Sequence, residues 1–170
     1  MRQVSLLAFF CIVILTSCSR TVPCINNWVT PGFVGFSFSD LDTLIVREYK
    51  KDDNFSTLLD TALFVTDSTI LSAGTSNDTT IIELNHIVGE EKYLFPDHDW
   101  QIYIPAKNML VSISNFDSPQ NEHKCVLGGD MCPPCVNPIN SFLQDGQNTL
   151  PQFGKIPFGA GDYYLTYIHR

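Results

Sequence analysis

The sequence predicts an all-β protein built as a single β-sandwich, immunoglobulin-like in the loose architectural sense. Short segments rich in β-branched and aromatic residues recur along the chain, and turn-forming residues separate them. No long window shows the 3.6-residue period of an amphipathic helix. The chain of 170 residues is long enough for one hydrophobic core and short for two domains. We therefore expect one sandwich domain over residues 32–170.

Each expected strand shows either period-two alternation or a short apolar run bounded by turn residues. The expected strands are residues 32–38, 42–49, 61–65, 79–84, 100–104, 109–116 and 162–168. Two segments have the composition of short helices, 55–59 and 139–143, the second because Asn137 and Pro138 are favourable helix-start residues. Residues 117–161 are dense in Pro, Gly and Asn and are expected to form a long loop, which must be pinned by cross-links in a compact domain.

The first eighteen residues have the pattern of an export signal. Arg2 and the terminal amine are positive, residues 4–15 are mainly apolar, and the small residues Thr16 and Ser17 precede Cys18. The apolar run is too short for a membrane-spanning helix, which needs roughly 20 residues. The sequence therefore predicts a signal peptide over residues 1–17 and a tether over residues 18–31 that ends at a Pro-Gly pair.

The ending Leu15-Thr16-Ser17-Cys18 resembles the lipobox of bacterial lipoprotein precursors. This resemblance implies cleavage before Cys18 and attachment of a diacylglycerol to its thiol, which gives a stable membrane anchor through two acyl chains. The alternative is an ordinary secretory signal, cut after Ser17 or Cys18, with no lipid attached. If the lipobox is used, the partner implied for the N-terminus is a membrane.

The whole chain is similar in style to the small β-rich lipoproteins of Bacteroidota, although only the leader carries a specific motif. In that group, surface export uses an acidic run directly after the lipid-bearing cysteine, whereas Ser19-Arg20-Thr21 follows here. The resemblance therefore implies a lipid-anchored protein of the cell envelope, on the periplasmic side of the outer membrane. Several Asp-Ser/Thr tripeptides also resemble the O-glycosylation signal of that group. The implied acceptors are Thr43, Thr61, Ser68 and Thr79.

The charge of the chain excludes some partners. The formal net charge is −8, which disfavours nucleic acid, since phosphates require Lys or Arg for neutralisation. It equally disfavours docking on anionic lipid through a basic patch, so attachment should depend on the lipid of Cys18. No Gly-rich phosphate loop or Gly-x-Ser-x-Gly motif is present, and no cofactor is expected.

Four cysteines remain after the leader cysteine Cys11 and the anchor Cys18 are set aside. An exported chain with an even number of remaining cysteines is expected to form disulfides. We expect Cys125–Cys132 to close the turn at Gly128-Gly129, and Cys24–Cys135 to tie the N-terminal tether to the loop.

Two other interpretations of the cysteines remain open. Cys132-Pro133-Pro134-Cys135 has the C-x-x-C spacing of thiol-disulfide oxidoreductases, but the βαβ frame of those enzymes is missing around it. His123 together with Cys125, Cys132 and Cys135 could form a zinc set, although thiols in an oxidising space pair with one another first. We expect no metal site.

The remaining polar and aromatic clusters point to binding rather than catalysis. Asp97-His98-Asp99 is interpreted as a solvated turn ahead of a strand. Alternation over 162–168 places Tyr163 and Tyr167 on one face and Tyr164 on the other. Core or cross-strand packing is the first interpretation of these aromatic residues, and an exposed aromatic row that binds a sugar or a protein is the alternative. The sequence thus favours a non-enzymatic binding or assembly component with a protein or glycan partner, and thiol-disulfide exchange at Cys132 and Cys135 is the alternative.

Overall fold

The computed structural model describes residues 19–65, 79–82, 94–126, 135–155 and 162–170. The chain divides into two compact units. The small unit contains residues up to 26 together with residues 120–137, and the sandwich contains residues 27–119 and 138–170. Each unit is described by itself.

One layer of the sandwich is a six-stranded antiparallel sheet. Its strands, in spatial order, are β12 (Gln147–Thr149), β11 (Ser141–Gln144), β8 (Met109–Asp117), β7 (His98–Ile104), β4 (Thr43–Lys50) and β5 (Leu58–Val65). Strands β4, β7 and β8 are neighbours in the middle of this order, so both of their edges are hydrogen-bonded.

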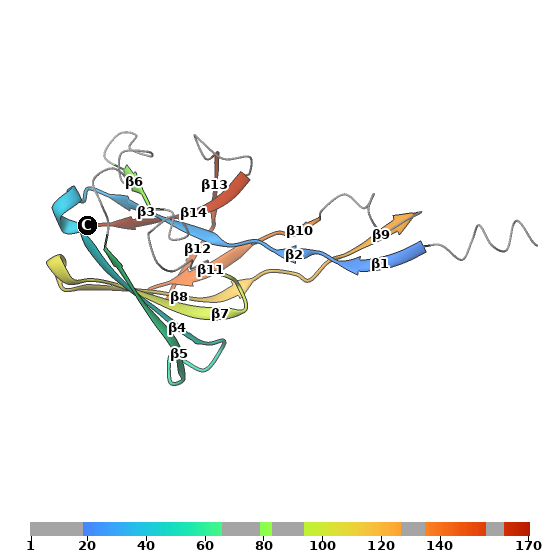
Figure 1. Ribbon diagram of the computed structural model, residues 1–170, viewed down its shortest axis with the longest axis horizontal. Helices are drawn as coiled ribbons and strands as arrows, with labels where there is room; N and C mark the ends of the chain where they lie inside the picture. Colours follow the sequence, from blue (N-terminus) through green and yellow to red (C-terminus); the bar gives the residue numbers. More distant parts are fainter. Residues whose placement is uncertain (1–18, 66–78, 83–93, 127–134, 156–161) are drawn as a thin grey trace, which may run out of the picture. The chain divides into compact units, whose positions relative to one another are not determined.

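The other layer is a four-stranded sheet. Its strands, in spatial order, are β13 (Gln152–Lys155), β14 (Asp162–His169), β3 (Val29–Val34) and β6 (Thr79–Ile81). The pair β14–β3 is parallel, and the other two pairs are antiparallel. Figure 1 shows the two sheets as two layers of ribbon, one above the other.

The core lies between these two sheets, because the inward positions of the alternating strands are apolar. On the six-stranded sheet, the inward residues Trp100, Ile102 and Ile104 of β7 are buried, and of their outward neighbours in that strand only Asp99 is buried. In β8, Val111 and Ile113 are buried and the residues beside them are not. The same cluster contains the inward residues of the other sheet. Its largest fully buried side chains include Trp100, Phe33, Phe64 and Phe142. The all-β sandwich predicted from the sequence is confirmed.

Two short 3₁₀ turns contact each other in the sandwich, η1 (Phe38–Asp40) and η2 (Pro105–Lys107). Lys107 Nζ lies 2.7 Å from Asp40 Oδ1, and Ser37 N–H donates to Asp40 Oδ2. The hydrogen bond from Lys107 is the main reason why the pKa of Asp40 falls to about 2. The described residues contain no α-helix, and so none that could span a bilayer.

The Pro-Gly pair at Pro31-Gly32 does not end a tether, as predicted, but lies inside β3. Pro31 has no N–H to donate, yet its carbonyl accepts from Ile82 N–H at 3.3 Å. A Cβ on Gly32 would lie 3.3 Å from Cδ1 of Tyr167, so glycine permits the close approach of that ring from β14. Here a pair that is typical of a turn serves a packed central strand instead.

The helix predicted over residues 139–143 is wrong, because Ser141–Gln144 forms β11. Residues 55–59 are likewise not helical, since they end a turn and begin β5. Asp145 and Gly146, both with positive φ, make the two-residue turn that leads from β11 into β12. The region expected as a long loop therefore contains strands, among them β11, β12 and β13.

The small unit consists of two pairs of short strands. β1 (Ser19–Pro23) pairs antiparallel with β9 (Glu122–Val126), and β2 (Ile25–Asn26) pairs parallel with β10 (Val136–Asn137). Strands thus occur within residues 18–31, where the sequence predicted a tether. Two-stranded sheets are marginally stable alone, so other bonds must hold this unit.

A disulfide and a buried asparagine hold the small unit together. Cys24 is bonded to Cys135, 111 residues later in the sequence, which confirms the predicted pairing. Asn137 is fully buried; its carbonyl oxygen accepts from Asn121 N–H at 2.8 Å, and its amide donates to Cys24 O and to Asn26 Oδ1. Removal of this side chain would break partly buried hydrogen bonds with Cys24, Asn26 and Asn121.

Candidate functional site

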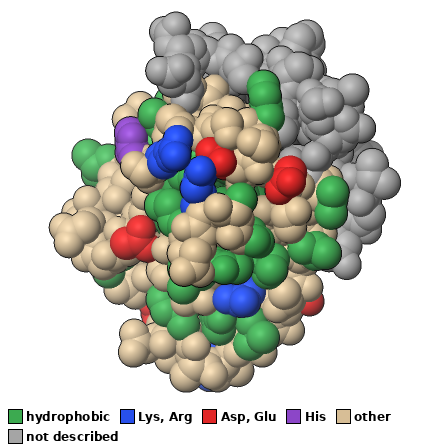
Figure 2. Space-filling view, turned by 90° about the vertical axis from the view of Figure 1, so that its left-hand side faces the viewer, with side chains coloured by type: hydrophobic (Ala, Val, Ile, Leu, Met, Phe, Trp, Pro, Cys, Tyr) green, Lys and Arg blue, Asp and Glu red, His purple; other side chains and the backbone are tan. Residues whose placement is uncertain are grey.

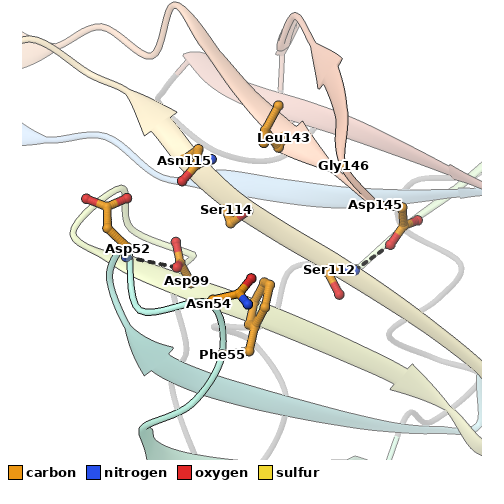
Figure 3. A pocket seen from close by; sticks show the side chains of 10 residues that line it. All are labelled: Asp52, Asn54, Phe55, Asp99, Ser112, Ser114, Asn115, Leu143, Asp145 and Gly146. Carbon is orange, nitrogen blue, oxygen red and sulfur yellow. Dashed lines mark hydrogen bonds between the residues drawn. The ribbon is translucent and has the colours of Figure 1, made fainter.

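A hollow of about 420 Å³ lies on the outer face of the six-stranded sheet, the face turned away from the core. Two hairpin turns and three strands provide its lining (Figure 3). The lining residues are Asp52, Asn54 and Phe55 from the β4–β5 turn, Asp99 from β7, Ser112, Ser114 and Asn115 from β8, Leu143 from β11, and Asp145 and Gly146 from the β11–β12 turn. Its volume is within the range of small-molecule sites.

The β4–β5 turn is held in a strained shape beside the hollow. Asp52, Asn54 and Phe55 all have φ close to +58°, a left-handed conformation that phenylalanine rarely adopts. The ring of Phe55 packs edge-on against Tyr49, with 5.4 Å between ring centroids. The hydroxyl of Tyr49 donates to Gln101 Oε1 at 3.0 Å, which fixes the supporting ring. The turn therefore holds the ring of Phe55 beside the hollow, against the fixed ring of Tyr49.

A backbone irregularity in β8 brings two polar residues to the same side. Asn115 has φ of +50°, and the pairing of β8 with β11 shifts register at this point. As a result, Ser114 and Asn115 both line the hollow, whereas Phe116 returns to the core. The Asp145-Gly146 turn closes the other side, where Asp145 Oδ1 accepts from Ser112 N–H at 2.7 Å.

Asp99 is the most unusual residue of the hollow. It is 1% exposed, although it lies on the outer face of β7. Its Oδ2 accepts from Asp52 N–H at 3.0 Å, as drawn in Figure 3. Its Oδ1 has no hydrogen-bond partner among the described residues, although the backbone N–H of Asn115 lies close enough to lower the pKa of the carboxyl. Asp99 thus lines the hollow, and one of its carboxylate oxygens is buried without a partner.

Burial raises the pKa of Asp99 above its ordinary value of 3.8. The negative charge of Asp52 acts in the same direction, whereas the hydrogen bond from Asp52 N–H, the nearby N–H of Asn115 and the charge of Lys51 act against it. The interpretation of residues 97–99 as a solvated turn is therefore wrong for Asp99. His98 lies on the other face of β7, with Nδ1 3.0 Å from Glu48 Oε1 and 3.4 Å from Asp97 Oδ1.

The remaining outer face of this sheet carries an apolar row. The register places Leu63, Ile45, Tyr103 and Leu110 side by side across β5, β4, β7 and β8. Leu63 and Leu110 are exposed, and the guanidinium of Arg47 lies 6.0 Å from the ring centroid of Tyr103. Figure 2 shows that hydrophobic side chains also gather on the side of the molecule that it faces. The hollow is thus the polar region of a partly apolar sheet face.

Most residues predicted as sites lie away from this hollow. Thr43 begins β4, Thr61 is exposed in β5, and Thr79 begins β6. Ser68 and Cys18 lie outside the described residues. On the last strand, Tyr164 is buried in the core and Tyr167 is half-buried, while the side chain of Tyr163 is not described.

The bond between Cys135 and Cys24 bears on both alternative interpretations of the cysteines, the redox pair and the zinc site. In this structure Cys135 is therefore unavailable for a C-x-x-C pair with Cys132 or for a zinc ligand set with His123. Cys132 and the predicted Cys125–Cys132 bond lie outside the described residues. Within the described ranges, no three His, Cys, Asp or Glu residues are grouped as a metal site would require.

Comparison of the chain with protein-family models, with curated proteins and with solved structures finds no match.

The substitution Asp99→Asn is expected to raise the free energy of unfolding at pH 7, by about 1 kcal/mol. The amide keeps an acceptor for Asp52 N–H and removes the buried negative charge. Because the pKa of Asp99 is raised in the folded protein, the ionised carboxyl costs stability above that pKa, and this cost disappears below pH 3.8, where the unfolded chain is protonated too. Urea unfolding at pH 7 and at pH 3 measures the difference.

The matched control is Asp97→Asn, which makes the same change of charge two residues away, on a side chain that is 54% exposed. We expect the control to change stability by less than about 0.5 kcal/mol. A loss of stability in Asp99→Asn at pH 7 would mean that the carboxylate is a structural group.

Proposed function

We propose that this protein is a lipid-anchored, non-enzymatic binding protein of a bacterial cell envelope, and that the hollow on the six-stranded sheet is its ligand site. The observation that carries the proposal is Asp99, a buried carboxylate with an unpartnered oxygen that lines the hollow. Such a group costs stability in the empty protein, and costly groups are characteristic of functional sites.

The lining supports binding rather than catalysis. Asp99 and Asp145 each accept a backbone N–H, and in the part of the chain that the structure describes neither has a hydrogen bond or ion pair with a histidine, cysteine or lysine that could act as a nucleophile or general base. The remaining lining consists of amide, hydroxyl, aliphatic and aromatic side chains, which suit a small ligand that donates hydrogen bonds. A small molecule or a glycan end is therefore the favoured kind of partner.

Support for the anchor comes from the leader. Cleavage before Cys18 and lipidation of its thiol would hold the sandwich at a membrane, on the periplasmic side of the outer membrane. The disulfide Cys24–Cys135 is consistent with an oxidising compartment, where such bonds persist. O-glycosylation at Thr43, Thr61, Ser68 and Thr79 belongs to the same proposal, and Thr61 is exposed.

The anchor is tested by expressing the full chain in a Gram-negative host and weighing the membrane-extracted protein by mass spectrometry. We expect a mature chain that begins at Cys18 and carries a diacylglycerol, and we expect Cys18→Ser to abolish this modification. Recovery of the unprocessed chain from the cytosol would contradict the proposal. The same spectrum reports any glycan attached to the acceptor residues.

The ligand site is tested by a thermal-shift screen of the purified protein against neutral sugars, amino acids and small amines. A ligand at 100 times its Kd stabilises the folded state by about 2.7 kcal/mol. We expect Leu143→Trp and Ser114→Trp, which fill the hollow from two strands, to remove the shift. Leu110→Trp, on the same sheet face outside the hollow, should keep it. Equal thermal shifts in the two blocking variants and in the Leu110→Trp control would mean that the ligand binds outside the hollow.

A further inference from the structure

The charged side chains that line the hollow are all acidic. Three carboxylates line it, those of Asp52, Asp99 and Asp145, and the described lining contains no Lys, Arg or His. The charge of Lys51 acts on Asp99 from outside the lining and is the smallest of the effects on its pKa. Two of the carboxylates each accept one backbone N–H, which leaves acceptor capacity unused. The oxygen of Asp99 that lacks a partner is buried, so water does not readily hydrogen-bond to it. An anionic ligand would meet uncompensated like charge, whereas a cation would relieve it.

The apolar part of the lining indicates which kind of cation fits. Phe55 and Leu143 line the same hollow as Asp99. Figure 3 shows their side chains on different sides of it, with Phe55 beside Asn54 and Leu143 on β11. An aromatic ring and an aliphatic side chain next to carboxylates suit a ligand with a carbon skeleton and an ammonium group. A bare metal ion would gain nothing from contact with the aromatic ring or the aliphatic side chain.

Two further observations separate the candidates. A metal ion requires several converging ligands, and the described residues hold no group of three His, Cys, Asp or Glu that could bind one. A neutral polyol can donate to Asp99 Oδ1, but it leaves the negative charge of the three carboxylates uncompensated. An ammonium group both donates the hydrogen bond and supplies the opposite charge.

We propose that the hollow binds a small organic amine in its protonated form, with the ammonium group paired with the carboxylate of Asp99 and the carbon skeleton lying against Phe55 and Leu143. This inference rests on the proposed binding function and names the chemical class of its ligand. Asp52 and Asp145, on the two turns, contribute long-range attraction at the rim. The amide and hydroxyl groups of Asn54, Asn115, Ser112 and Ser114 are available for the other polar groups of such a ligand.

The test compares matched pairs of probes that differ in one functional group. Titration calorimetry of the purified protein at pH 7 would use glucosamine against glucose, and 1,5-diaminopentane against 1,5-pentanediol. We expect the amine of at least one pair to bind more tightly than its hydroxyl counterpart by about tenfold or more, which is the scale of one charge-assisted hydrogen bond.

The Asp99→Asn variant should weaken binding of that amine by about tenfold or more, whereas Asp97→Asn should leave it unchanged. Asp99→Asn is expected to be at least as stable as the parent protein, and circular dichroism verifies its fold. Phe55→Ala provides a second variant and should weaken the binding of the amine with the longer carbon skeleton.

The outcomes separate this inference from the proposed function. If the hydroxyl partner binds as tightly as the amine, and the blocking variant Leu143→Trp removes both, the hollow is a ligand site and the amine inference is wrong. If neither pair binds, the amine inference is overturned, and the proposed function then depends on the broader screen. Amine binding that survives both Asp99→Asn and Leu143→Trp would also overturn the inference.

Discussion

Replacement of Trp100 by alanine is expected to lower the free energy of unfolding of the sandwich by about 4 kcal/mol. Trp100 is 2% exposed and is the largest of the fully buried side chains. It lies in β7 between Glu48 of β4 and Ile113 of β8 in the register, so it fills the middle of the six-stranded sheet. Its indole N–H donates to Phe95 O at 2.9 Å, and His98 packs edge-on against its ring.

Urea unfolding followed by far-ultraviolet circular dichroism measures this loss, since Trp100→Ala removes one of the two tryptophans needed for fluorescence. Trp100→Phe is the matched control, because it keeps most of the apolar volume and loses the indole hydrogen bond. We expect the control to cost about 1 to 2 kcal/mol. Equal losses in the two variants would mean that the hydrogen bond, and not the packing, dominates at this position.

The sheet around Trp100 could be predicted because its strands carry a clear period. In β7 the alternate residues Trp100, Ile102 and Ile104 are apolar, and Val111 and Ile113 continue the pattern in β8. A half-buried strand in a sandwich requires this alternation, so sequence and structure agree where one face is core and the other is surface.

Most of the strands that were missed have little apolar content of their own, and β11, with Phe142 and Leu143, is the exception. Strand β12 consists of Gln147, Asn148 and Thr149, none of them apolar, and it is defined by its pairing with β11. The Asp145-Gly146 pair between β11 and β12 is typical of a hairpin turn, whereas Asn137 and Pro138 have the composition of a helix start and led to the wrong prediction of a helix. Asn137 is instead a buried hydrogen-bonding centre of the small unit. Its role depends on partners distant in sequence.

The candidate site was not predictable for a related reason. Asp99 is the last residue of an Asp-His-Asp group, which in isolation is typical of a solvated turn. Its burial arises from contacts with the β4–β5 turn, where Asp52 lies 47 residues earlier in the chain, and from the irregularity at Asn115 in β8. Local composition carries no signal for either contact. The positive-φ asparagines near the hollow were the only local hint, since asparagine tolerates that conformation.

Loss of the Cys24–Cys135 disulfide is expected to lower the free energy of unfolding by about 4 kcal/mol. The two cysteines are 111 residues apart in sequence, so the bond closes a long loop and strongly restricts the unfolded chain. The strands next to the bond are short, with two residues each in β2 and β10. Few backbone hydrogen bonds can therefore replace it.

The measurement is urea unfolding of the double variant Cys24→Ser/Cys135→Ser, combined with hydrogen exchange of the small unit. We expect amides of β1, β2, β9 and β10 to lose protection first, because paired two-stranded sheets are marginal without a cross-link. Cys125→Ser/Cys132→Ser is the matched control, because the predicted bond between these two cysteines would close only a short loop in the chain. Because loop-closure entropy grows with loop length, this control should cost less than the long-range pair. An equal or greater loss in the control would show that the stability of the small unit depends on the short loop, and that Cys24–Cys135 is not its main constraint.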